Sequence, residues 1–100
     1  MREKSIEQQL FHAVRRQGGI AVKLVSPAYA GLPDRLVLLP GGHMAFVEVK
    51  APGKKPGPLQ MTRARMLRRM GFRVCVLDHP DRIPALIVSI CRPPEGRGDS

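Results

Sequence analysis

Aromatic side chains are scarce in this chain of 100 residues, which has no tryptophan, one tyrosine and three phenylalanines. A platform for single-stranded nucleic acid stacks successive bases on aromatic rings, so this scarcity argues against that class of protein. No apolar run approaches the length of a membrane span, and the N-terminus lacks the apolar segment of a secretory signal. We therefore expect a cytoplasmic protein with no membrane partner.

Cysteine is scarce as well. The two cysteines, Cys75 and Cys91, both lie in apolar segments. Because cytoplasmic thiols stay reduced, we expect two free thiols in the core, with a single disulfide as the alternative.

Acidic residues are few: 8 of them stand against 17 lysines and arginines, which gives a net charge of +9. In a domain this small, such an excess indicates a polyanionic partner, with DNA or RNA first. An anionic membrane surface would require an amphipathic helix with a large aromatic or leucine face, which the sequence does not offer. We expect one small domain over residues 1–92, whose basic side chains contact backbone phosphates, and a polar, disordered tail over residues 93–100.

The apolar pattern predicts an α/β fold in the order α-β-β-β-α-β-α, with a mixed four-stranded sheet flanked by helices. A capping box formed by Ser5 and Gln8 begins the first helix, and Gly18-Gly19 ends it. The expected strands are 20–25, 35–39, 44–49 and 72–77, and the expected helices are 5–16, 59–70 and 83–90, although 85–90 also fits a strand. Because a helix separates the third and fourth strands, these two should be parallel.

The first two helices are predicted to be amphipathic. The apolar face of the first comprises Ile6, Leu10, Phe11, Ala13 and Val14, and that of the second comprises Leu59, Ala64, Met66, Leu67 and Met70. Glu7 and Gln60 fall inside these apolar arcs. A carboxylate that faces a core requires a cation or a lysine nearby, unless it bends outward to solvent.

Two carboxylates and a lysine are expected at one end of a β-hairpin. Pro33-Asp34 stands before one strand, and Glu48-Val49-Lys50 ends the next, across the Pro40–His43 connection. Side chains alternate along a strand, so Glu48 and Lys50 share a face. Glu-x-Lys alone is common at solvated strand edges, but the strand 44–49 is largely apolar, and charges buried there need a partner. A divalent cation that prefers oxygen ligands fits.

Taken together, these motifs resemble the PD-(D/E)xK nuclease superfamily and, within it, the small stand-alone VRR-NUC domain of bacterial and phage genomes. The resemblance covers about residues 5–90 and rests on four motifs in order: Glu7, Pro33-Asp34, Glu48-x-Lys50 and Gln60. It implies a restriction-endonuclease-like αβββαβ core, a divalent metal, hydrolysis of DNA phosphodiester bonds, and often a homodimer that acts on branched DNA such as four-way junctions. The loop 51–58, with its three prolines, departs from the pattern.

Roles for the side chains follow from the resemblance and from their chemistry. Asp34, Glu48 and the backbone carbonyl of Val49 would hold Mg²⁺ or Mn²⁺, and Glu7 would contribute directly or through water. Lys50 would position the attacking water or stabilise charge on the phosphate. Gln60 would hydrogen-bond that water or orient Lys50.

Sequence-independent contacts to DNA are expected from six basic residues: Lys54, Lys55, Arg63, Arg65, Arg68 and Arg69. Arg63 projects into the apolar sector of its helix and should reach past the core edge toward an anion. The sequence thus predicts a metal-dependent DNA endonuclease. The alternatives are a basic, non-catalytic DNA-binding module whose acids form core salt bridges, and a nuclease that acts on RNA. The apolar segment 83–90 hints at a partner copy, because it exceeds what one small sheet needs for cover.

Overall fold

The computed structural model describes residues 1–92, so the predicted tail 93–100 lies outside the described residues. The described chain contains, in order, α1 (Glu3–Arg16), β1 (Ile20–Lys23), β2 (Arg35–Leu39), β3 (His43–Val49), α2 (Pro58–Arg69), β4 (Val74–Leu77), the 3-10 turn η1 (Pro80–Arg82) and α3 (Ile83–Ile90). The predicted order is confirmed, and the closing segment 83–90 is a helix.

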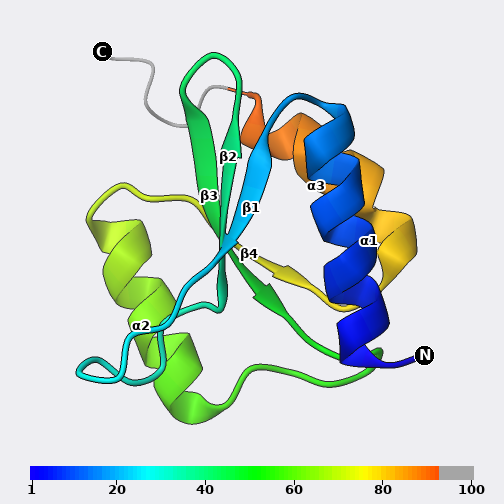
Figure 1. Ribbon diagram of the computed structural model, residues 1–100. Coiled ribbons are helices and arrows are strands. Elements are labelled where there is room, and N and C mark those ends of the chain that lie inside the picture. The colour runs from blue at the N-terminus through cyan, green and yellow to red at the C-terminus, as the bar shows by residue number, and fades with distance from the viewer. Residues whose placement is uncertain (93–100) are drawn as a thin grey trace.

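The four strands form one mixed sheet in the order β1-β2-β3-β4. β1 pairs with β2 and β2 with β3 in antiparallel fashion, whereas β4 runs parallel to β3, as the helical crossover requires. Figure 1 shows α1 and α3 on one side of the sheet and α2 on the other side, toward one end of the strands. The predicted αβββαβ core is therefore confirmed.

One face of the sheet carries the core. Val37 lies opposite Ala45 in the register of β2 and β3, so both side chains point the same way, and both are fully buried. Val47 and Val49 continue this row along β3, and α1 packs on it with Ile6, Leu10 and Val14. The alternate residues of β3, Phe46 and Glu48, consequently point toward the side of α2.

Element boundaries differ from the predicted ones by two residues at three places, and by one residue in β3 and α2. α1 begins at Glu3, after Arg2, and Ser5 accepts a hydrogen bond from Gln9 one turn later, so the predicted capping box was wrong. A carboxylate in the first turn, here Glu3, favours an early helix start because it faces the positive end of the helix dipole. β1 ends at Lys23 rather than at residue 25, and β4 begins at Val74 rather than at residue 72.

Several apolar side chains are more exposed than the helical pattern indicates. Phe11 is 44% exposed, and Leu67 is the residue of α2 that is buried, while Leu59 and Met70 are 46% and 58% exposed. Helical periodicity identifies the apolar face, but how much of it is covered depends on the neighbouring elements. α2 touches the sheet mainly beside β4, at the edge of the sheet.

The expectation that both cysteines lie in the core was wrong for Cys91. Cys75 and Cys91 are both free thiols, but Cys91 is exposed because it follows the last turn of α3. Cys75 is half-buried, and burial raises the pKa of its thiol. None of the helices within residues 1–92 combines the length and the hydropathy that crossing a membrane requires.

Candidate active site and metal centre

Asp34 stands where the chain enters β2, and its side chain reaches across to β3. Its Oδ1 accepts a hydrogen bond of 3.2 Å from the backbone N–H of Val49, which ties the start of one strand to the end of the other. Pro33 before it is buried. Burial raises the pKa of Asp34 above its usual value, and the nearby carboxylates of Glu7 and Glu3 raise it further, although the Val49 N–H acts in the opposite direction.

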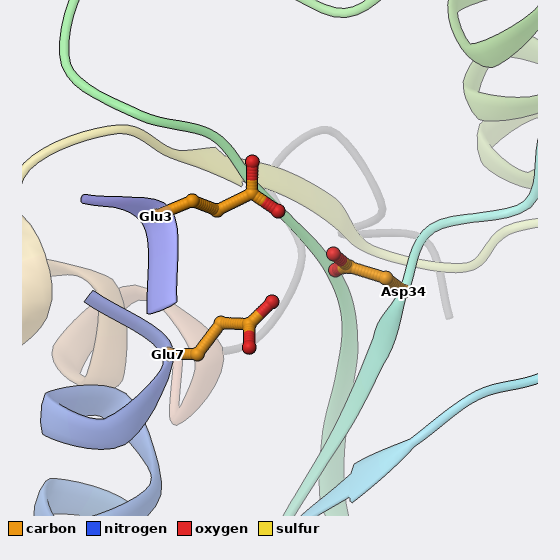
Figure 2. A group of neighbouring side chains, drawn as sticks. All are labelled: Glu3, Glu7 and Asp34. Carbon is orange, nitrogen blue, oxygen red and sulfur yellow. The ribbon is translucent and has the colours of Figure 1, made fainter. Parts of the chain in front are cut away.

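Three carboxylates converge beside this strand start. Glu3 and Glu7 extend from the first turns of α1 toward Asp34, and one oxygen of each lies within 4.8 Å of the others (Figure 2). Like charges this close repel unless a proton or a cation lies between them. Glu7 and Asp34 were predicted members of the site, whereas sequence reasoning missed Glu3. The available signal was the spacing of four residues between Glu3 and Glu7, which places both on one helix face.

The cation that lets Glu7 lie against the sheet is Arg35, which the sequence reading also missed. Its Nη2 donates to Glu7 Oε1 at 3.0 Å, and both side chains are largely buried. Because side chains alternate along a strand, Arg35 points to the α1 face. Glu7 is therefore fixed in place by an ion pair rather than bent outward to solvent.

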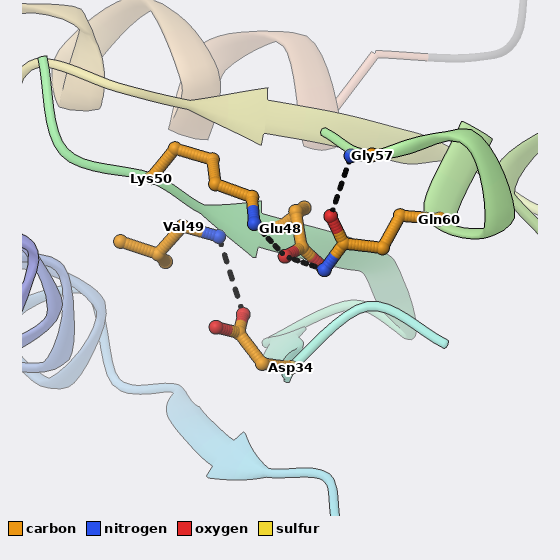
Figure 3. A network of polar contacts seen from close by, with 6 residues as sticks. All are labelled: Asp34, Glu48, Val49, Lys50, Gly57 and Gln60. Carbon is orange, nitrogen blue, oxygen red and sulfur yellow. Dashed lines mark hydrogen bonds and ion pairs between the residues drawn. The ribbon is translucent and has the colours of Figure 1, made fainter. Parts of the chain in front are cut away.

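Glu48 lies on the α2 side of β3 and is the buried charged residue of the described chain, with 5% of its surface exposed. Its Oε2 receives two donors: Lys50 Nζ at 3.3 Å and Gln60 Nε2 at 2.8 Å (Figure 3). Its Oε1 is buried and has no hydrogen-bond partner within residues 1–92. Burial raises the pKa of Glu48, and the negative charge of Asp34 raises it further, against the effect of Lys50.

Gln60 owes its orientation to the start of α2. Gly57 precedes the helix and Pro58 occupies its first position, where a missing N–H costs nothing. Gln60 Oε1 accepts from the Gly57 N–H at 2.9 Å, so its Nε2 is left to donate to Glu48. Gln60 was expected to orient Lys50 or a water. In the structure it donates to the Glu48 oxygen that Lys50 also contacts, so its hydrogen bond holds Glu48 directly.

No family model matches the chain. It is 53% identical over 81 residues to the protein named "Putative nuclease p44" of Acyrthosiphon pisum secondary endosymbiont phage 1. The matched residues make up 81% of this chain and 87% of that protein. A solved structure described as a VRR_NUC domain superposes with a TM-score of 0.80 and 31% identity, covering 86% of this chain and 94% of that one. The chain belongs to the VRR-NUC nuclease family.

The predicted DNA-binding residues of this VRR-NUC chain differ in whether they also contact a backbone oxygen of the chain itself, as Arg63 and Arg68 do. Lys54, Lys55, Arg65 and Arg69 have exposed side chains, in the loop before α2 and along α2 itself. Arg68 is also exposed but donates through Nη2 to the backbone oxygen of Val74 at 2.8 Å, which links α2 to β4.

Arg63 makes internal contacts instead of extending into solvent. Its Nε donates to the backbone oxygen of Ala30 at 2.9 Å, and its guanidinium carbon lies 4.2 Å from the centre of the Tyr29 ring. The same loop approaches α2 at Gly31, where φ is +89° and a Cβ would lie 2.7 Å from Leu59 Cγ. In the VRR-NUC fold of this chain, Arg63 thus attaches the loop that leads to Asp34 to α2. This contact does not depend on whether the other N–H groups of Arg63 also bind an anion.

Proposed function

We propose that this chain is a divalent-metal-dependent DNA endonuclease that hydrolyses phosphodiester bonds. The observation that carries the proposal is the state of Glu48: a buried carboxylate with one oxygen held by two donors and the other, Oε1, without a donor among residues 1–92. A buried acceptor left bare costs free energy unless a ligand completes it. Asp34 stands beside it with its pKa also raised by burial.

The side chains fit a hard cation. Asp34, Glu48 and the backbone carbonyl of Val49 are oxygen donors of the kind that Mg²⁺ and Mn²⁺ prefer, and Glu7 and Glu3 add carboxylates on the side of α1. When bound there, Mg²⁺ or Mn²⁺ would polarise the scissile phosphate and strengthen a water as nucleophile. The raised pKa values of Asp34 and Glu48 describe the metal-free site, since a cation favours both ionised forms.

Lys50 and Gln60 complete the proposed machinery. Lys50 Nζ lies 3.3 Å from Glu48 Oε2 and can donate its remaining protons to a phosphate oxygen or to the attacking water. Gln60 donates to the same Oε2 and thereby fixes which oxygen of Glu48 stays free. This division of the two oxygens also argues against a purely structural ion pair, which would satisfy both of them.

A cleavage assay tests the proposal. Linear, nicked, flapped and four-way DNA should be cut in Mg²⁺ or Mn²⁺ and left intact in EDTA, with the branched forms cut faster. Asp34→Ala, Glu48→Ala and Lys50→Ala should each reduce cleavage by at least about 100-fold, with DNA binding retained because phosphate contacts lie elsewhere. DNA binding without cleavage would instead support the basic, non-catalytic module, and faster cleavage of the matching RNA would reassign the substrate.

The proposed assembly is a homodimer, so that two active sites face a two-fold symmetric substrate such as a four-way junction. Segment 83–90 leaves little apolar surface for a partner, because Ile83, Leu86 and Ile90 of α3 are buried in the core of the single chain. Val88, in the same segment, is an exposed apolar residue, with 53% of its surface accessible to solvent.

A larger apolar surface lies on the sheet face opposite α1, which we call the open sheet face. It comprises Ile20, Val22, Leu36, Leu38, Met44 and Phe46, which stand opposite one another across β1, β2 and β3. Ile20 and Val22 are 43% and 39% exposed. Phe72, which is 42% exposed, packs edge-on against Phe46 at the margin. An apolar surface of this kind favours a protein partner, and a second copy of the chain is the partner proposed here.

A further inference from the structure

A groove runs between α2 and the β4 edge of the sheet, immediately beside Glu48. It has a volume of about 280 Å³. Its walls are mostly apolar and are formed by Pro33, Pro56, Met61, Ala64, Val74 and Val76, and Glu48 and Gln60 also line it. Drug-sized ligands occupy pockets of roughly 300 Å³ and more. The groove is therefore suited to a smaller, flat, largely apolar group.

The rim of the groove is cationic. Lys55, Arg65 and Arg68 line it, and Glu48, already paired with Lys50, is the acidic residue among its lining groups. A positively charged rim around an apolar interior suits a ligand with an anionic backbone and an uncharged ring. The centre of a protein–protein interface is instead depleted of charged residues, so three cations around the groove do not fit a protein partner.

The groove is also continuous with the proposed catalytic cluster. Gln60 forms part of its wall and donates to Glu48 at 2.8 Å, and Figure 3 shows the Gln60 amide between Glu48 and the start of α2. A phosphate placed at Glu48 and Lys50 has its neighbouring nucleotide within reach of this groove. That phosphate cannot itself enter the apolar interior, because a desolvated charge is costly there.

We propose that the groove receives one unpaired nucleobase, from a nucleotide next to the phosphate that lies at Glu48 and Lys50. This inference rests on the proposed nuclease function and specifies its substrate: DNA with an unstacked base beside the cleavage position. Within the groove the base packs against the aliphatic wall and beside Arg65 and Arg68, whose guanidinium groups can stack on a base in place of the missing aromatic rings.

The energetics of base extrusion connect the groove to branched DNA. Removing a base from an intact duplex costs a few kcal/mol, and the cost is least where the base is already unpaired. A protein that must place a base in this groove therefore favours flaps, whose bases are unpaired, and ends and junctions, where base pairs open more easily than in continuous duplex. Selectivity for DNA structure then arises within one chain, without contacts to a particular base sequence.

The test uses 2-aminopurine, a fluorescent base that brightens when it leaves the stack. Flapped and four-way DNA, each carrying one 2-aminopurine at successive positions around the branch, are titrated with the wild-type protein in EDTA, so that no cleavage occurs. We expect a rise in fluorescence at one or two adjacent positions. An abasic nucleotide at the same position should weaken binding by at least about fivefold, the lower end of a base-stacking contact.

Variants that fill the groove identify where the base goes. Ala64→Phe should abolish the fluorescence rise and bind normal and abasic DNA alike, whereas Ala85→Phe, the same substitution at an exposed position of α3 outside the groove, should behave as wild type. Val76→Phe fills the groove from β4 and serves if Ala64→Phe does not fold, as judged by circular dichroism.

The outcomes separate this inference from the nuclease function. Cleavage in Mg²⁺ without any fluorescence rise, or an equal rise in both filled variants, would overturn the base-binding groove and leave the nuclease standing. A rise that the filled variants lose, in a protein that never cleaves, would support the groove and overturn the nuclease. Absence of DNA binding would overturn both.

Discussion

At the scale of single residues, the two oxygens of Glu48 divide the work of the site. Oε2 is held by Lys50 and Gln60, whereas the buried Oε1 has no hydrogen-bond partner within residues 1–92. With Asp34 close by, the metal-free site stores unfavourable electrostatic energy, as the raised pKa values of both acids indicate. Function and stability therefore conflict at these two positions.

This conflict predicts a pH-dependent gain of stability in a double variant. Both acids have folded pKa values above their usual 3.8 and 4.5, so the folded chain binds more protons, and stability falls as the pH rises through this window. In EDTA near pH 7, Asp34→Asn/Glu48→Gln should be more stable than wild type by on the order of 1 kcal/mol. The difference should vanish near pH 3, where the wild-type acids are protonated in both states. Urea unfolding across pH measures it, and a constant difference would contradict the explanation.

Gln60 is predicted to act as a positioning residue for Glu48. Gln60→Leu keeps the side-chain size but removes both hydrogen bonds, so Glu48 loses its fixed orientation. Mn²⁺ affinity, measured by electron paramagnetic resonance, should fall about 10-fold, and stability should fall by about 1 kcal/mol with the lost cap. Gln9→Leu, a glutamine exposed on α1, is the matched control. A loss of stability with unchanged Mn²⁺ affinity would assign Gln60 a structural role alone.

At the scale of elements, the strands were predicted better than the helix surfaces. β2 has the predicted bounds. Glu48 and Lys50 share a face as predicted, because the alternation of side chains along a strand depends only on the local backbone. Glu3 and Arg35 were missed because their partners come from another element, and proximity between α1 and β2 is set by packing. The contact of Arg63 with the loop at Ala30 and Tyr29 was missed for the same reason, while its predicted contact with an anion stays a prediction.

The exposed side of α2 is predicted to bind DNA through phosphates. Arg65→Ala/Arg69→Ala should weaken binding to all sequences alike and lower the slope of log affinity against log salt by roughly 0.9 for each contact removed. Lys54→Ala/Lys55→Ala should act in the same way. Arg15→Ala/Arg16→Ala removes the same charge from exposed positions at the end of α1 and is the control. An equal change of slope in the control would show a general charge effect rather than a binding face.

At the scale of the whole molecule, the open sheet face predicts a dimer. Sedimentation at micromolar concentration should give a mass near twice 11.1 kDa. Ile20→Glu/Val22→Glu should yield monomers, because each change would bury a charge in the interface, whereas Val88→Glu on α3 should leave the dimer intact. A wild-type monomer that cuts linear and branched DNA equally fast would refute the dimer and its link to junctions.

The parallel pairing of β3 with β4 affects the order in which the protein folds during its synthesis. β2 and β3 can pair as soon as their short turn forms, but β4 reaches β3 only after the loop and all of α2 lie between them, and Lys50 N–H then bonds to the Leu77 oxygen at 2.9 Å. Contacts so distant in sequence close slowly. During synthesis the acids of the hairpin therefore emerge well before the strand that fixes Lys50, and a nascent chain carries the residues of a nuclease before it has the framework of one.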